Sequence, residues 1–94
     1  DLFIVDLAEN IKELRIALEH LDFTKISSIA HRTKGAAGTV SADECQWLAQ
    51  CLEKAADEGR ADEARQIVET LAEALEKLKK VFNDKQFPFY PSNQ

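Results

Sequence analysis

The pattern of apolar positions along the chain predicts four amphipathic helices. In the first segment, about residues 2–21, apolar residues recur every three or four positions and form one stripe: Phe3, Leu7, Ile11, Leu14 and Leu18. Asn10 lies between the two halves of this stripe, and we expect it to mark a break between a short N-terminal helical segment and a longer helix. A second stripe, from Phe23 to Val40, has spacings that alternate between three and four residues, which is typical of antiparallel bundles.

Capping residues predict where the other helices begin and end. Asp22 is a suitable N-cap for the second helix. Ser41 and Glu44 have the spacing of a capping box, which predicts a third helix with Ser41 as its N-cap. Gly59 suits the end of that helix, because a residue in the left-handed conformation is often needed there. A fourth apolar stripe extends over about residues 61–83.

Helices of this length with short connections predict an all-α fold, an antiparallel up-and-down four-helix bundle. We assign residues 1–83 to the bundle and residues 84–94 to a C-terminal tail. Both prolines of the chain fall in this tail. The tail either packs along the bundle or forms a flexible terminus, and the sequence favours neither arrangement.

The charge and cysteine content argue against a nucleic-acid-binding, membrane-bound or disulfide-linked protein. Twelve Lys and Arg against seventeen Asp and Glu give a net charge of −5, which argues against binding of nucleic acid or of anionic lipid. No apolar run approaches the roughly 20 residues that span a bilayer, so we expect no membrane contact. Cys45 and Cys51 would lie about 9 Å apart along one helix, too far for a disulfide. We expect reduced thiols, a cytoplasmic location and a monomer.

The second helix carries a face that a purely structural helix would not need. At spacings of three, four and seven residues around His31 lie one lysine and four very small residues: Ser27, Ser28, Lys34, Gly35 and Gly38. Each glycine inside a helix costs roughly 1 kcal/mol relative to alanine. We interpret the pair as clearance that lets a partner approach the imidazole closely.

The residue types on this face suit phosphoryl chemistry. Imidazole is a good nitrogen nucleophile near neutral pH. A phosphoryl group on His31 would bring about two negative charges, and Lys34, one turn along, is a natural cationic partner for them. The alternative is that His31 is an ordinary surface histidine, and the two glycines argue against it.

The segment from Ala30 to Val40, AHRTKGAAGTV, resembles the signature of histidine phosphotransfer (HPt) domains, which is roughly His-x-x-Lys-Gly followed by small residues. Leu48, Leu52 and Glu53 resemble the Leu-x-x-x-Leu-Glu pattern of the third helix in that family. The resemblance covers about residues 3–82. Such domains are four-helix bundles, which agrees with the fold that the apolar stripes predict.

The resemblance implies a phosphorelay intermediate. HPt domains accept a phosphoryl group on histidine from the aspartyl phosphate of a receiver domain and pass it to an aspartate of another receiver. By position, His31 is the phosphoacceptor, Lys34 stabilises the phosphoryl group, and Glu53 orients the imidazole. The family needs no cofactor of its own, binds no ATP and has no autokinase activity, whereas Mg²⁺ belongs to the receiver. The setting is the C-terminal part of a hybrid sensor histidine kinase or a free-standing carrier.

The expected receiver-docking surface follows from the same comparison and consists of Ser27, Ser28, Arg32, Gly35 and Gly38. Apolar residues of the first helix are expected to form a rim beside it: Phe3, Ile4 and Leu7. Two positions depart from the family pattern. Ser41 stands where Gly is usual, and Thr33 replaces a usual Leu, with a hydroxyl that can bond a carbonyl one turn back.

Two other functional classes remain as alternatives. The first is a helical docking module that lacks phosphotransfer activity. The second, a metal-binding bundle, ranks last, because His20 and His31 fall in different helices and no Glu-x-x-His motif is present. The chain also has no Gly-rich nucleotide loop, so we exclude a kinase. Trp47 lies off the apolar stripe of the third helix, and we expect it to be half-buried.

Overall fold

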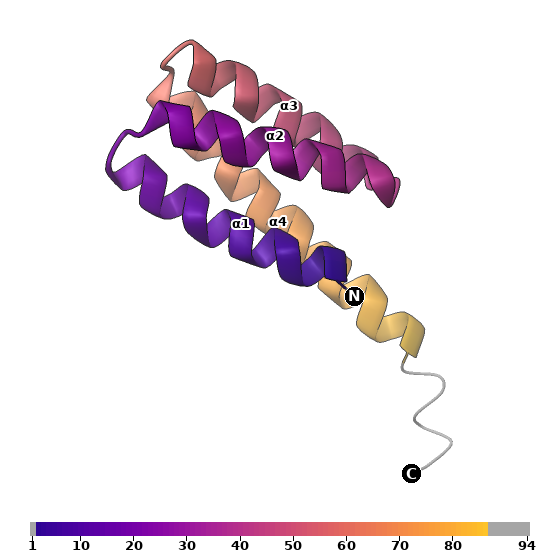
Figure 1. Cartoon of the computed structure of the whole chain (residues 1–94). Helices are drawn as coiled ribbons and strands as arrows, with labels where there is room; N and C mark the ends of the chain where they lie inside the picture. The colour runs from indigo at the N-terminus through magenta and orange to yellow at the C-terminus, as the bar shows by residue number, and fades with distance from the viewer. Residues whose placement is uncertain (1, 87–94) are drawn as a thin grey trace.

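Four helices make up most of residues 2–86, the part of the chain that the computed structural model describes, with side chains described through Phe82. They are α1 (Leu2–Glu19), α2 (Phe23–Thr39), α3 (Asp43–Asp57) and α4 (Ala61–Gln86). Each helix packs against two others, in the order α1–α2–α3–α4 and back to α1 (Figure 1). The predicted all-α four-helix bundle is confirmed, and the described residues include no strand.

α1 is one uninterrupted helix, so the expected break at Asn10 is wrong, and the structure has no separate short N-terminal segment. Asn10 is buried in the middle of α1. Its side chain finds hydrogen-bond partners on α2, which are described with the site below. The side chain of Asn10 therefore makes its hydrogen bonds to a neighbouring helix, and α1 continues through this residue without a break.

The first three helices end in the same way. The residue after each C-cap has a positive φ, and the next N–H bonds back to the carbonyl five residues earlier, as in a Schellman motif. The positive-φ residues are Leu21 at 52°, Ser41 at 59° and Gly59 at 69°. The back-bonding donors are the N–H groups of Asp22, Ala42 and Arg60, at 2.8–2.9 Å from their acceptors. The predicted role of Gly59 at a helix end is confirmed.

The capping box expected at Ser41 is wrong. Ser41 closes α2, while α3 begins at Asp43 and its N-cap, Ala42, makes no side-chain cap hydrogen bond. The left-handed φ of Ser41 gives a conformational reason for the glycine usual at this position, since only glycine adopts that region without steric cost. Asp22, in contrast, caps α2 as expected and accepts a hydrogen bond from the Lys25 N–H at 3.1 Å.

α4 is longer than its apolar stripe predicts. It extends to Gln86, so the boundary that we placed before residue 84 falls inside a helix. Residues 87–94, the rest of the predicted tail, lie outside the described residues. Within the described part of the chain, α4 is not long and apolar enough to cross a membrane, and neither is any other helix.

The core is built from the apolar stripes of all four helices. The largest fully buried side chains are Leu7, Leu14, Ile26, Ile29, Thr33, Leu52, Val68 and Leu71. Alanines are also buried on α2 and α3, and they let these two helices approach closely: Ala30, Ala37, Ala49 and Ala56. The contact between α2 and α3 is the most extensive in the bundle. This close contact places a side chain of α3 next to His31.

Two surface predictions are wrong. Phe3 and Leu7 are buried in the core rather than forming a rim at the surface, and Ile4 is partly buried against that core. The exposed apolar residues of that helix turn are Leu2 and Val5. The α1 stripe is needed inside the bundle, so its outer neighbours become the surface. Trp47 is 64% exposed instead of half-buried, and it lies at the edge of a surface hollow between α3 and α4.

Candidate functional site

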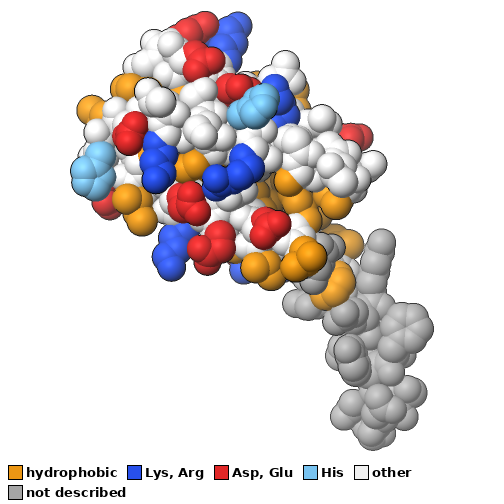
Figure 2. Space-filling view, viewed as in Figure 1, with side chains coloured by type: hydrophobic (Ala, Val, Ile, Leu, Met, Phe, Trp, Pro, Cys, Tyr) orange, Lys and Arg blue, Asp and Glu red, His pale blue; other side chains and the backbone are white. Residues whose placement is uncertain are grey.

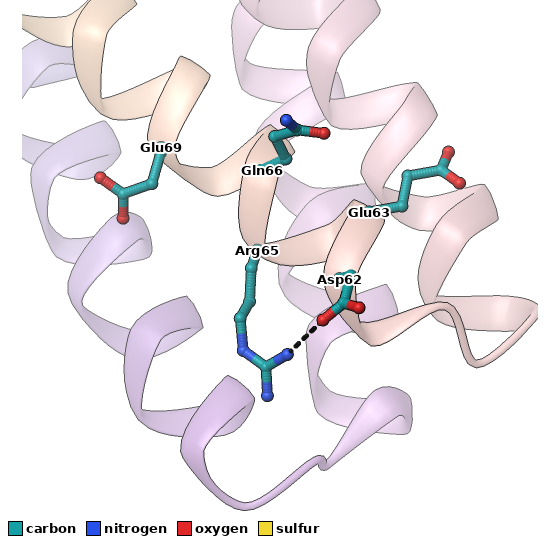
Figure 3. Close-up of a pocket in the computed structure, with 5 residues that line it drawn as sticks. All are labelled: Asp62, Glu63, Arg65, Gln66 and Glu69. Carbon is teal, nitrogen blue, oxygen red and sulfur yellow. Dashed lines mark hydrogen bonds and ion pairs between the residues drawn. The ribbon is translucent and has the colours of Figure 1, made fainter.

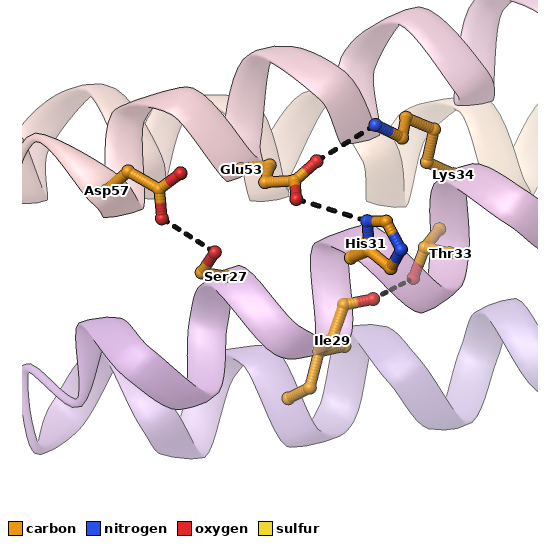
Figure 4. A network of polar contacts seen from close by, with 7 residues as sticks. All are labelled: Ser27, Ile29, His31, Thr33, Lys34, Glu53 and Asp57. Atoms are coloured by element: carbon orange, nitrogen blue, oxygen red, sulfur yellow. Dashed lines mark hydrogen bonds and ion pairs between the residues drawn. The ribbon is translucent and has the colours of Figure 1, made fainter.

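The site centres on His31, in the middle of α2, with a side chain that is 70% exposed. Its Nδ1 lies 3.2 Å from Oε2 of Glu53 on α3 (Figure 4). A carboxylate only accepts hydrogen bonds, so Nδ1 carries the proton and donates it. This bond fixes the neutral imidazole in the tautomer that leaves the lone pair on Nε2. The second nitrogen is therefore the nucleophilic atom of this ring.

Lys34 lies one helical turn beyond His31 and contacts the same carboxylate. Its Nζ is 3.1 Å from Oε1 of Glu53. The side chains of Lys34 and Glu53 are 31% and 24% exposed, so the ion pair is partly shielded from water. Glu53 thus uses one oxygen for the imidazole and the other for the ammonium group. The structure brings together all three residues to which the sequence assigns chemical roles.

The two glycines of this face have different surroundings. Gly35 is exposed, and a Cβ placed on it would meet nothing within 4 Å. A Cβ on Gly38 would lie 2.8 Å from Nε2 of Gln46 on α3. Gly35 therefore leaves open space beside His31, as expected. Gly38 lies instead at the contact between α2 and α3, which gives its small size a packing reason that sequence spacing did not reveal.

Three further residues of the expected docking surface also differ in their contacts. Ser28 is exposed. The Ser27 hydroxyl donates to Oδ1 of Asp57 at 2.7 Å, which ties the start of α2 to the end of α3. Arg32 points toward α1, where it donates to Oδ1 of Asn10 at 2.9 Å and to Oε1 of Glu13 at 3.2 Å. Its guanidinium group is therefore held in place from α1.

A buried polar chain lies beneath the site, and the sequence analysis did not identify it. Nδ2 of Asn10 donates to Oγ1 of Thr33 at 3.0 Å, and the Thr33 hydroxyl donates to the carbonyl of Ile29 at 2.8 Å. The second bond confirms the back-bonding predicted for Thr33. Asn10 is a polar residue in the apolar stripe of α1, and Thr33 is one in the stripe of α2. A search for polar residues within the two stripes could have predicted this contact. No buried side-chain polar atom among the described residues lacks a partner.

The surface around the site carries charges of both signs, and both histidines of the chain reach the surface in Figure 2. His20 is exposed, and its Nδ1 donates to the carbonyl of Ile16 at 3.0 Å, so it is a solvated residue at the end of α1 as predicted. Among the side chains that the structure describes, through Phe82, no group of three or more His, Cys, Asp and Glu is placed to hold a metal ion.

A shallow surface hollow lies away from His31. It has a volume of about 720 Å³ and is lined only by residues of the first turns of α4: Asp62, Glu63, Arg65, Gln66 and Glu69 (Figure 3). Arg65 and Asp62 form an ion pair at 3.0 Å within it. Because a single helix supplies its lining, the hollow has no opposing wall and is not enclosed like a ligand pocket.

Both cysteines are free thiols, as predicted. Cys45 is buried beside a groove of about 210 Å³ between α3 and α4, and Cys51 is partly buried about 1.7 turns along the same helix. Burial, and secondarily the charge of Glu44, raises the pKa of the Cys45 thiol. A thiol with a raised pKa is a poor nucleophile, so we assign Cys45 to packing.

Comparison with known proteins agrees with the geometry. The family model of the Hpt domain matches residues 1–81. No curated protein and no solved structure matched the chain. The family match covers the whole described bundle up to the last turns of α4 and includes every residue of the site. The chain therefore belongs to the Hpt family, the histidine phosphotransfer modules of phosphorelays, rather than to the kinase catalytic domains.

Proposed function

We propose that this domain takes a phosphoryl group onto Nε2 of His31 from the aspartyl phosphate of one receiver domain and delivers it to the aspartate of another. The observation that carries the proposal is the bond between Nδ1 of His31 and Glu53, at 3.2 Å. It leaves the lone pair on Nε2 of a ring that is 70% exposed. A nucleophile with this exposure is accessible to a reacting group held by a second protein.

The transfer step is a displacement at phosphorus. The Nε2 lone pair forms the new N–P bond, and the bond from phosphorus to the receiver's carboxylate oxygen breaks, with its electron pair remaining on that carboxylate. The imidazole gains positive charge as the bond forms. Glu53 faces the Nδ1–H and balances this charge, as a carboxylate does behind other catalytic histidines. Lys34, one helical turn beyond His31, supplies the cation for the negative oxygens of the phosphoryl group once its flexible side chain turns toward them.

The local surface suits a receiver as partner. Hpt domains interact with receiver domains, whose phosphorylation site is acidic and holds Mg²⁺. Ser28 and Gly35 leave space beside the imidazole. Arg32 and Lys34 are the cations of this face in a chain of net charge −5, and in the free domain they pair with Glu13 and Glu53. Such local charge complementarity favours fast and transient association over tight binding. This domain itself needs no cofactor in the proposed step.

The test is phosphoryl transfer from a panel of labelled phospho-receiver domains to the wild type, to His31→Gln and to His20→Gln. His20→Gln is the matched control, because it removes the other histidine, which is exposed and outside the site. We expect label in the wild type and the control that is labile to acid and stable to base. Label that persists in His31→Gln, or a folded wild type that no donor labels, would contradict the proposal. The second result would favour a docking module without phosphotransfer activity.

We also propose the setting that the sequence analysis favours, a cytoplasmic module of a hybrid sensor histidine kinase. Two free thiols are consistent with a reducing compartment. A free-standing carrier is the alternative. The size of the tagged natural gene product on a denaturing gel distinguishes them, since a hybrid kinase would place this domain in one long polypeptide and a carrier would not.

A further inference from the structure

One carboxylate serves both chemical residues of the site. Glu53 contacts Nδ1 of His31 with one oxygen and Nζ of Lys34 with the other, at 3.2 Å and 3.1 Å (Figure 4). Among the described residues, no other acidic side chain forms an ion pair with Lys34. In the unmodified protein the ammonium group is therefore already occupied. The proposed function needs the same group for the phosphoryl oxygens.

The two anions that Lys34 would contact, the Glu53 carboxylate and the phosphoryl group, lie on different sides of the imidazole ring. Glu53 lies on the Nδ1 side, whereas a phosphoryl group on Nε2 would lie on the other side. The lysine side chain is a flexible four-carbon chain that ends in a compact charge, so its ammonium group can swing from one anion to the other. Glu53 does not need to move, because its second oxygen still accepts the hydrogen bond from Nδ1.

We propose that Glu53 is a positioning residue for Lys34 as well as for His31, and that phosphorylation transfers the ammonium group from Glu53 to the phosphoryl group. This inference rests on the proposed function. The ion pair stabilises only the unphosphorylated state. Because it must break on phosphorylation, its free energy reduces the net stabilisation that Lys34 gives to the phosphorylated state. Glu53 therefore keeps the phosphoryl group easier to pass on than Lys34 alone would.

A double-mutant cycle isolates this effect from every other role of Glu53. In the wild type, Lys34→Met removes the contact with the phosphoryl group and also the ion pair that had to break. In a Glu53→Gln background, Lys34→Met removes only the contact with the phosphoryl group. The loss caused by Lys34→Met is therefore larger in the Glu53→Gln background. Glu53 also affects the charge of the imidazole ring. That effect is the same before and after Lys34→Met within each background, so it cancels when the two losses are compared.

The measurement uses phosphoramidate as a small phosphoryl donor, so that receiver docking does not enter. The P–N bond of phosphoramidate breaks, the bond from Nε2 of His31 to phosphorus forms, and ammonia leaves with the electron pair. At a fixed ratio of phosphoramidate to ammonia and at pH 8, ³¹P NMR gives the equilibrium ratio of phosphorylated to unmodified protein. Circular dichroism checks that each of the four proteins is folded.

We expect Lys34→Met to lower this ratio about fivefold more in the Glu53→Gln background than in the wild type. That factor corresponds to about 1 kcal/mol, the upper range for partly exposed ion pairs. Glu69→Gln is the matched control, because it removes a carboxylate from an exposed ion pair with Arg15 on other helices. In that background, the effect of Lys34→Met should equal its effect in the wild type.

Each other result has a definite meaning. Equal losses in the Glu53→Gln and wild-type backgrounds, or a smaller loss with Glu53→Gln, would overturn the transfer of Lys34 while leaving phosphorylation of His31 intact. If Lys34→Met leaves the ratio of phosphorylated to unmodified protein unchanged in every background, the proposed transfer of Lys34 is overturned as well. A folded wild type that phosphoramidate does not modify at His31 would instead overturn the proposed function, and this inference with it.

Discussion

Asn10 of α1 and Thr33 of α2 are both buried, and Nδ2 of Asn10 donates to Oγ1 of Thr33 at 3.0 Å. The same Asn10 side chain accepts a hydrogen bond from Arg32, which is next to His31 in the chain. Among the described residues, Asn10 and Thr33 are the two buried polar side chains, and they link the two helices within an apolar core. It fixes the position of α1 against the helix that carries the site, because buried polar groups tolerate few alternative partners.

Asn10→Ala should therefore destabilise the bundle. The change removes two hydrogen bonds and leaves a gap in the core, and we expect the free energy of unfolding to fall by about 1–3 kcal/mol. Urea unfolding followed by circular dichroism measures it. Glu9→Ala, at an exposed position of the same helix, is the control and should change stability by less than about 0.5 kcal/mol. A loss of equal size in both variants would show that the Asn10 link contributes nothing specific.

Gly35 and Gly38 should respond differently to alanine. At Gly35 a Cβ meets open space, so Gly35→Ala should raise the free energy of unfolding by up to about 1 kcal/mol through helix propensity alone. At Gly38 the Cβ would lie 2.8 Å from the Gln46 side chain, which must move. We expect little or no gain from Gly38→Ala in the same urea experiment. Equal gains at both positions would mean that Gln46 moves away without cost.

Gly35→Gln tests the clearance that we assign to this position. The long side chain would stand in the open space beside His31 and obstruct a docking protein, but it would not block a small donor. We expect transfer from a phospho-receiver to slow by about tenfold, which is about 1.4 kcal/mol, and modification by phosphoramidate to continue at the wild-type rate. If both donors slow to the same extent, the variant damages the reacting group itself and docking clearance is not the reason.

The helices and the chemical face could be predicted from the sequence because both depend on local spacing. The apolar stripes gave the four helices, and positions three and four residues from His31 gave Lys34 and Gly35. Glu53 was found through the family resemblance, and not through spacing, since it comes from another helix. The structure adds its second contact, with Lys34, which no pattern within one helix contains.

Two of the differences between prediction and structure have the same physical cause. Asn10 suggests a helix break by its local preference, but a partner on α2 satisfies its side chain inside the helix. Gly38 shares the spacing of Gly35, yet Gln46 of α3 covers it. In both cases a contact between helices decided the outcome. The Ser41 error is different, since two local signals competed and closure of α2 prevailed over capping of α3.

Ser41→Gly should stabilise the bundle. Ser41 has a φ of 59°, where a side chain costs roughly 1–2 kcal/mol and glycine does not. The residue is exposed, so the change removes no buried contact. We expect a gain of about 1 kcal/mol in the free energy of unfolding. Gly59→Ala is the reciprocal variant, with a φ of 69° and open space around its Cβ, and should lose a similar amount. A loss of stability in Ser41→Gly would show that the serine hydroxyl has a role of its own.

Cys45 should make stability depend on pH in the alkaline range. Burial, followed by the charge of Glu44, raises the pKa of this thiol above its ordinary value of about 9.0. The folded state therefore holds the thiol proton more tightly than the unfolded chain does. The resulting stabilisation is complete below the unfolded pKa and is lost as the pH rises through the folded pKa.

The free energy of unfolding of the wild type should thus decrease above about pH 9, and Cys45→Ala, although less stable at neutral pH, should show a smaller decrease. Urea unfolding from pH 7 to pH 10.5 measures both slopes, with Cys51→Ala as the control for the other thiol. If the slopes of wild type and Cys45→Ala are the same, the Cys45 thiol does not titrate differently in the folded and unfolded states.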